Sequence, residues 1–239
     1  MNLFLIGGGW SDDHAQAMFG DFVSAAARRS GSTPPRILLV VMGTDDDARE
    51  YHRKYEHALA LAGVTDLVIE RVAEGEEIPV AALEGIDGLF VGGGPTPEYH
   101  ASLRPAYALI RELVADGLPY AGFSAGAAIA ARTAIIGGWR VDGVPVCPED
   151  SNEELDPVTV VDGIGLFEGA VDVHAAQWGN LSRLVAAVES GLVPGGIAID
   201  ECTTLALDGD SRRVLGAGRV WQVTAGPDGP IVSRASSSR

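Results

Sequence analysis

Residues 118–133 read Leu-Pro-Tyr-Ala-Gly-Phe-Ser-Ala-Gly-Ala-Ala-Ile-Ala-Ala-Arg-Thr. Within this stretch, Gly122-Phe123-Ser124-Ala125-Gly126 matches Gly-x-Ser-x-Gly, the pattern of a nucleophile elbow. In an elbow a strand turns sharply into a helix, and the glycines leave the room that the turn needs. The stretch therefore predicts a strand at 120–123, a strained turn that presents the Ser124 hydroxyl, and a helix. A packing turn with an incidental serine is the alternative.

Strands alternate with helices on both sides of this stretch. Apolar runs predict buried strands, and helical spacing predicts helices. We expect strands at 2–6, 36–42, 67–71, 88–91, 120–123, 170–173 and 196–200, and helices at 13–29, 49–62, 79–84, 97–116 and 180–189. Short runs at 205–208, 213–215 and 220–223 predict a closing antiparallel meander. The order indicates an α/β fold in one domain over residues 1–239, with a mostly parallel, doubly wound sheet, helices on both faces and a small antiparallel C-terminal extension.

The composition of the chain argues against several classes of function. The net charge is −16 with 17 lysines and arginines, which argues against nucleic acid as a partner and mildly favours a basic substrate, although an acidic surface also serves solubility. Cys147 and Cys202 make no disulfide framework, and no ligand spacing indicates a metal or another cofactor. Neither a signal peptide nor a run long enough to span a membrane is evident. We therefore expect a cytoplasmic protein without a metal or membrane contact.

Two glycine runs follow strands. Gly7-Gly8-Gly9 fails the dinucleotide-binding pattern because Asp12 takes the place of its third glycine, so we expect this loop to lie close to the active site. After 88–91 comes Gly92-Gly93-Gly94, without the Gly-Lys-Ser/Thr of a phosphate loop. If the strands at 88–91 and 120–123 are neighbours, the Gly93 and Gly94 amides lie near Ser124. The Gly94 and Ala125 N–H groups then form an oxyanion hole.

A serine nucleophile needs a base and an acid that orients the base. His174 ends the apolar run 169–173, and Glu201 follows the strand at 196–200. Three strand ends thus predict a triad of Ser124, His174 and Glu201. The simpler alternatives are a histidine that closes a strand and a salt bridge between Glu201 and Arg183. The irregular stretch 137–156 is expected to form a loop with one hairpin over the site, and rival acids are Asp142, Asp172 and Asp200.

The chain resembles the S51 family of serine peptidases, which contains dipeptidase E and cyanophycinases. The resemblance rests on four blocks in order over nearly the whole chain, at residues 92–94, 122–127, 172–174 with 181–184, and 196–201. It implies a fold like that of class I glutamine amidotransferases, which is flavodoxin-like. It also implies that Ser124 is the nucleophile, His174 the base and Glu201 the acid, with Asp142 in reserve.

The resemblance further implies a short peptide substrate, cleaved by an acyl-enzyme route at an aspartyl or related residue. The residues expected to bind it are Gly93, Thr96, Trp178 and Arg183. Arg183 is expected to hold a substrate carboxylate, with Arg132 and Arg140 as weaker candidates, unless it only pairs with Glu189 or Glu201. Val173, Trp178 and Asn180 depart from the cyanophycinase pattern, which argues against cyanophycin as the substrate. A module on the same fold that binds a ligand without turnover is the competing interpretation, and a homodimer is left open.

Overall fold

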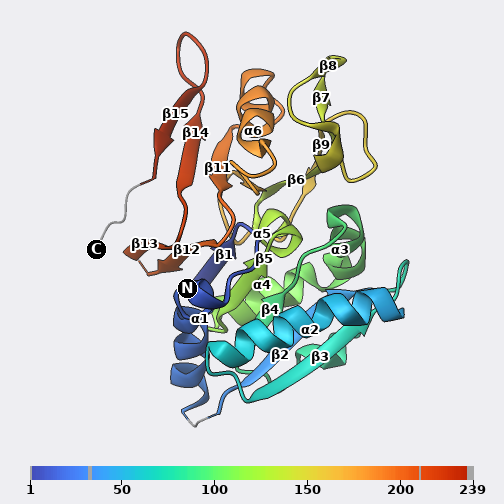
Figure 1. Cartoon of the computed structure of the whole chain (residues 1–239), viewed down its shortest axis with the longest axis vertical. Helices are drawn as coiled ribbons and strands as arrows, with labels where there is room; N and C mark the ends of the chain where they lie inside the picture. The colour runs from blue at the N-terminus through green and yellow to red at the C-terminus, as the bar shows by residue number, and fades with distance from the viewer. Residues whose placement is uncertain (1, 32–33, 210, 236–239) are drawn as a thin grey trace.

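A seven-stranded sheet forms the base of the computed structural model, which describes residues 2–31, 34–209 and 211–235 (Figure 1). Its strands follow the order β13-β12-β1-β5-β4-β2-β3. The strands β1, β5, β4, β2 and β3 run parallel, and β12 and β13 add an antiparallel hairpin beside β1. Their bounds are β1 Asn2–Ile6, β2 Arg36–Met42, β3 Asp66–Val72, β4 Gly88–Val91, β5 Tyr120–Phe123, β12 Thr203–Asp208 and β13 Ser211–Gly216.

Helices cover both faces of this sheet because its central strands are apolar on both sides. Phe4 and Ile6 of β1 share one buried cluster with α1 Ala15–Ser30 and α2 Asp46–Leu61. Leu3 and Leu5 point to the other face, where α3 Thr96–Leu103, α4 Tyr107–Ala115 and α5 Ala125–Ala130 lie. The mostly parallel α/β sheet predicted from the sequence is confirmed.

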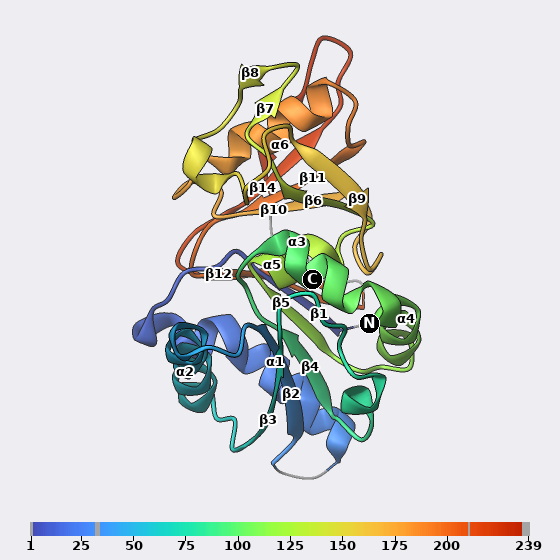
Figure 2. The same cartoon turned by 90° about the vertical axis from the view of Figure 1, so that its right-hand side faces the viewer.

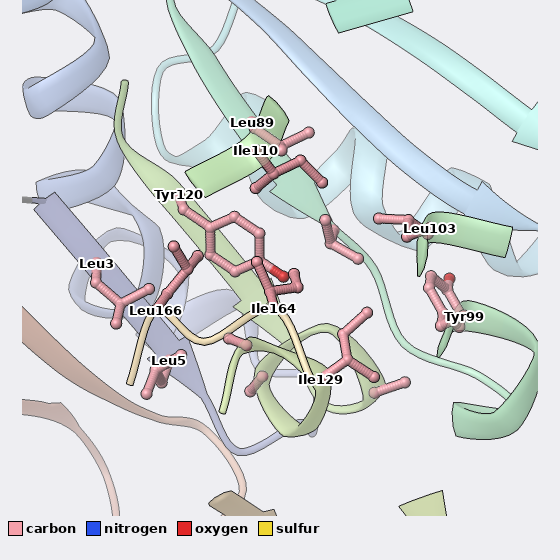
Figure 3. Close-up of a cluster of buried hydrophobic side chains, with 14 of the residues drawn as sticks. Leu3, Leu5, Leu89, Tyr99, Leu103, Ile110, Tyr120, Ile129, Ile164 and Leu166 are labelled. Atoms are coloured by element: carbon pink, nitrogen blue, oxygen red, sulfur yellow. The ribbon is translucent and has the colours of Figure 1, made fainter. Parts of the chain in front are cut away.

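The second of these clusters lies under the elbow. Figure 3 shows Leu3, Leu5, Leu89 and Ile129 packed around the ring of Tyr120. Tyr120 is fully buried, and its hydroxyl donates to the Gly126 carbonyl at 2.8 Å. The cluster therefore fixes β5 relative to the first turn of α5, on either side of the predicted nucleophile.

A separate four-stranded sheet, β10-β11-β14-β15, lies over α5 (Figure 2). One face, with Val171 and Ile197, joins the cluster around α5, and the other packs on α6. The bounds are β10 Ala170–Val173, β11 Gly195–Ile199, β14 Val220–Thr224, β15 Ile231–Arg234 and α6 Asn180–Glu189. The prediction of a single closing meander is wrong. The strands β12 and β13 join the large sheet, whereas β14 pairs with β11 of the small sheet.

Two further differences between the predicted and the observed elements have local causes. The helix expected over 97–116 is interrupted by a 3-10 turn at Arg104–Ala106, because Pro105 has no N–H for a helical hydrogen bond. The irregular stretch after α5 holds β6 Thr133–Gly137, which pairs with β9 Thr159–Asp162, and the expected hairpin, β7 Arg140–Val141 with β8 Val144–Pro145. Within the described residues, every helix is too short or too polar to cross a bilayer.

Candidate active site

Ser124 occupies a strained turn between β5 and α5. Its φ is 51° and its ψ is −109°, a backbone conformation that is costly for a residue with a side chain. A Cβ on Gly122 would lie 2.3 Å from the Gly126 oxygen, and a Cβ on Gly126 would lie 2.3 Å from the Val91 oxygen. Both glycines are therefore needed for the turn, as the elbow pattern predicted.

The three predicted strand ends meet, although they come from two sheets. Ser124 Oγ lies 2.8 Å from His174 Nε2, and His174 Nδ1 lies 2.7 Å from Glu201 Oε1. The elbow ends β5 in the large sheet, whereas His174 and Glu201 follow β10 and β11, which are parallel neighbours in the small sheet. Because His174 donates from Nδ1 to the carboxylate, its neutral form leaves Nε2 free to accept the Ser124 proton.

None of the other three acids considered for the triad contacts His174 through a hydrogen bond. Asp142 lies in the turn of the β7–β8 hairpin. Asp172 is paired with Arg183, and Asp200 accepts from the Arg219 N–H and the Trp221 indole. Asp200 and Glu201 follow β11 directly, but their carboxylates have different partners, and only Glu201 contacts His174.

The loop Gly7–Gly9 joins the two sheets beneath the triad. The Gly7 carbonyl accepts the His174 N–H at 3.0 Å, and the Gly8 carbonyl accepts the Cys202 N–H at 2.7 Å. A Cβ on Gly8 would stand 2.1 Å from Cε1 of His174, and one on Gly9 would stand 2.6 Å from Cβ of Glu201. The glycines thus allow the backbone to approach both side chains, as expected from the sequence.

Trp178 covers one face of the His174 ring. The two ring centroids are 3.9 Å apart with an angle of 8° between the planes, and the backbone N–H of Trp178 donates to the backbone carbonyl of His174. Trp178 is 44% exposed, whereas His174 is only 6% exposed. Burial lowers the pKa of His174 below its ordinary value, and the hydrogen bond to Glu201 works against this shift. The imidazole is therefore neutral, and able to act as a base, at neutral pH.

The glycine loop after β4 borders Ser124. A Cβ on Gly93 would lie 2.7 Å from Ser124 Cβ. The Gly93 N–H donates to the Tyr55 hydroxyl at 2.6 Å, so this amide is already occupied. Among the hydrogen bonds of the described residues, none uses the N–H of Gly94 or Ala125. These two amides therefore remain available to an oxyanion.

A cavity of about 350 Å³ opens in front of the triad. Ser124, His174, Trp178 and Gly94 contribute to its wall. Opposite them lies the segment after the β7–β8 hairpin, whose members in the wall are Asp150, Ser151, Asn152, Glu153 and Glu154. Sequence reasoning placed this segment over the site but missed its role as the acidic side of the cavity, because the stretch has no periodicity that indicates which side chains face inward. A larger cavity of about 480 Å³ lies between α1 and α2, with none of the triad residues in its wall.

Thr96 contacts this acidic segment. Its hydroxyl and its N–H both donate to the Glu153 carboxylate, at 3.1 and 3.3 Å. Burial raises the pKa of Glu153 above its ordinary value, and the bonds from Thr96 work against that shift. Thr96 therefore orients an acidic side chain of the cavity and is itself buried.

Arg183 does not have the role of carboxylate anchor that we expected from the sequence. Its guanidinium makes a two-pronged ion pair with Asp172, at 2.9 and 2.7 Å, and donates to the carbonyls of Gly138 and Ser151. The side chain is only 6% exposed. A forked cation engaged in this way has no pair of donors left for a substrate carboxylate, so a structural role replaces the predicted anchor. Neither Glu189 nor Glu201 is its partner.

The two weaker candidates for binding a substrate carboxylate are also paired with acidic residues of this chain. Arg132 pairs with Glu168, and Arg140 pairs with Asp156. No group of three or more metal-binding side chains is assembled in the part of the chain that the structure describes. Cys147 and Cys202 are both free thiols.

Replacing Arg183 with methionine is expected to lower the free energy of unfolding by about 3–5 kcal/mol, because Asp172 is left charged and unpaired in the interior. Urea denaturation measures this loss. Replacing both residues, Asp172→Leu with Arg183→Met, removes both charges and should recover much of it. Arg132→Gln, which breaks an exposed pair, serves as the control and should cost little. Unchanged stability of Arg183→Met together with a large rise in KM would instead favour the anchor role.

The chain is similar to known peptidases. The sequence pattern of peptidase family S51 matches residues 3–215. The chain is 29% identical to a cyanophycinase of Nostoc sp. over 227 residues, which cover 91% of this chain and 72% of that protein. It is 31% identical to Peptidase E of Pasteurella multocida over 172 residues, which cover 70% of this chain and 68% of that protein. A peptidase from an acI-B1 Actinobacterium shares the fold, with a TM-score of 0.71 and 18% identity over 100% of this chain and 95% of its own. The chain therefore belongs to peptidase family S51.

Proposed function

We propose that this protein is a serine-type hydrolase that cleaves a short peptide through an acyl-enzyme intermediate. The observation that carries the proposal is the unbroken chain of contacts from Ser124 through His174 to Glu201, at 2.8 and 2.7 Å, beside a cavity open to solvent. Each distance lies in the range of a hydrogen bond, and the order of groups is nucleophile, base and orienting acid.

The first half of the reaction forms the acyl-enzyme. Ser124 Oγ attacks the scissile carbonyl carbon while His174 Nε2 takes the hydroxyl proton. The carbonyl oxygen becomes an oxyanion, which the N–H groups of Gly94 and Ala125 receive. Glu201 stabilises the imidazolium that forms. The tetrahedral intermediate then collapses, and the leaving amine departs with the proton from His174.

The second half regenerates the enzyme. A water molecule replaces the amine and loses a proton to His174 Nε2 as it attacks the acyl carbon. Collapse of the second tetrahedral intermediate breaks the bond to Ser124 Oγ, which recovers its proton from His174. No step requires a group beyond the side chains and amides described above.

The substrate preference that the resemblance implied does not follow from the site. An aspartyl side chain needs a cation in the cavity. The three arginines considered from the sequence, Arg183, Arg132 and Arg140, are each paired with a carboxylate of this chain. We therefore propose peptide hydrolysis without an aspartyl preference.

A fluorophosphonate probe tests the proposed nucleophile. We expect it to label Ser124 covalently, as mapped by peptide mass spectrometry. The labelling rate should rise with pH through a pKa below the ordinary value for histidine and then level off, because only neutral His174 accepts the proton. His174→Ala should label far more slowly. An unreactive Ser124 in folded wild-type protein would favour the module that binds without turnover.

A further inference from the structure

Two exposed aromatic side chains border the open cavity in front of the triad. Eight large hydrophobic side chains are exposed in the part of the chain that the structure describes. The only two of these with aromatic rings, Tyr51 and Trp178, both lie in the wall of this cavity. Aromatic side chains that gather in a concave wall are typical of a binding site. The cavity therefore offers apolar surface to a ligand, in addition to the serine.

Trp178 has one flat face that no triad residue covers. The other face of its indole lies against the His174 ring, with centroids 3.9 Å apart and an angle of 8° between the planes. Trp178 is nevertheless 44% exposed. Because His174 occupies one face, the exposed area belongs to the opposite face and to the edges of the indole. A flat side chain can pack on that surface.

The backbone around Trp178 is held in place by hydrogen bonds. The N–H of Trp178 donates to the His174 carbonyl at 2.9 Å, and the N–H of Ala175 donates to the Ile199 carbonyl at 3.0 Å. The next residue, Gly179, begins α6 as its N-cap. A tryptophan fixed in this way loses little conformational freedom when a ligand packs on it, which favours binding.

The proposed chemistry places one part of the substrate beside this indole. His174 Nε2 takes the proton of Ser124 Oγ, 2.8 Å away, and passes it to the leaving amine. The leaving nitrogen therefore comes within hydrogen-bond reach of the His174 ring. The residue that carries this nitrogen is the first residue after the scissile bond, and it is the part of the substrate next to His174 and Trp178.

We propose that Trp178 binds the side chain of this leaving residue and gives the enzyme a preference for an aromatic ring there. The proposal rests on the hydrolase function above and adds its substrate class. An aromatic ring that stacks on the open indole face removes apolar area of both rings from water. The described residues of the cavity wall include no lysine or arginine but three acids, Asp150, Glu153 and Glu154, so the wall favours a neutral side chain over an acidic one.

The test compares kcat/KM for two matched sets of dipeptides, Xaa-Phe and Xaa-Gly, with the same residues used as Xaa in both. Each set is measured as free dipeptides and as C-terminal amides, because the acids of the wall oppose a further carboxylate. We expect kcat/KM to be about tenfold or more higher for Xaa-Phe, mainly through a lower KM, since partial burial of a phenyl ring contributes to binding by about this factor.

Three variants separate binding by the indole from its effect on the base. Trp178→Ala should reduce the ratio of Xaa-Phe to Xaa-Gly to less than about threefold, whereas Trp178→Phe keeps a flat ring and should retain most of the ratio. Leu192→Ala removes a side chain that is equally exposed, at 43%, but lies outside the cavity wall, and it should keep the wild-type ratio. If Trp178 only shields His174, Trp178→Ala slows both sets by the same factor.

Equal kcat/KM for the two sets in the wild type, or an unchanged ratio in Trp178→Ala, would overturn the proposal and leave the hydrolase function intact. Failure of the hydrolase function is distinguishable as the absence of cleavage in both sets. Calorimetric binding to Ser124→Ala then decides, because it needs no turnover. Tighter binding of Xaa-Phe than of Xaa-Gly, lost when Trp178→Ala is added, would support the proposal. Equal binding of the two sets, or no binding of either, would overturn it.

Discussion

Replacing Ser124 with alanine is expected to lower kcat/KM for peptide cleavage by about 10³- to 10⁶-fold. The alanine variant has no atom that can form the acyl-enzyme, so only the oxyanion hole and substrate binding still assist the attack of water. Steady-state cleavage of a dipeptide panel measures the loss. Ser124 sits at φ 51°, and alanine has the same Cβ at that position, so the backbone strain of the elbow is unchanged.

Ser151→Ala is the matched control. Ser151 borders the same cavity, but its hydroxyl donates to the Pro148 carbonyl at 2.8 Å, and no hydrogen bond joins it to His174. We expect its kcat/KM to stay within about tenfold of wild type. Activity in Ser124→Ala comparable to that of Ser151→Ala, with both variants folded by circular dichroism, would exclude Ser124 as the nucleophile.

The elbow could be predicted from the sequence because its requirements are local. Gly122, Ser124 and Gly126 lie within five residues, and the steric conflicts that a Cβ would cause involve the neighbouring turn and the adjacent strand. His174 and Glu201 were also predictable, since each follows a stretch that the sequence indicates as a strand, 170–173 and 196–200. The carboxyl ends of the parallel strands β10 and β11 share one edge of the small sheet, which makes the proximity of His174 and Glu201 predictable. The approach of Ser124 depends instead on how the large sheet packs against the small one.

The surroundings of the triad were not predictable in the same way. The sequence places Asp172 and Arg183 eleven positions apart, and nothing local distinguishes an arginine that binds substrate from one that pairs with a carboxylate in the interior. That pairing depends on how α6 packs against β10. Likewise, Glu153 and Glu154 both have positive φ angles, 54° and 59°, in a stretch without periodicity, so their side chains could not be assigned a direction. The assignment of the last strands to two sheets depended on tertiary pairing as well.

Gly8→Ala is expected to lower kcat/KM by about 100-fold or more, although Gly8 donates nothing to the reaction. The added Cβ would lie 2.1 Å from Cε1 of His174 and under 3 Å from both ring nitrogens, at 2.7 and 2.8 Å. Trp178 also stacks on one face of this ring, with centroids 3.9 Å apart, which limits the directions in which the ring can move. A base displaced by about 1 Å loses most of its effect on a positioned nucleophile.

Gly63→Ala separates this displacement from backbone strain. Gly8 and Gly63 have the same φ, +94°, but nothing lies within 4 Å of a Cβ built on Gly63. Both alanine variants should therefore lose about 1–3 kcal/mol of stability from the unfavourable φ, measured by urea denaturation, and Gly8→Ala should lose more because of its clash with His174. Only Gly8→Ala should also lose activity and fluorophosphonate labelling at temperatures where both proteins are folded. If the two variants have equal activity, the close approach of Gly8 to the imidazole does not position the base, and Trp178 and Glu201 hold His174 without it.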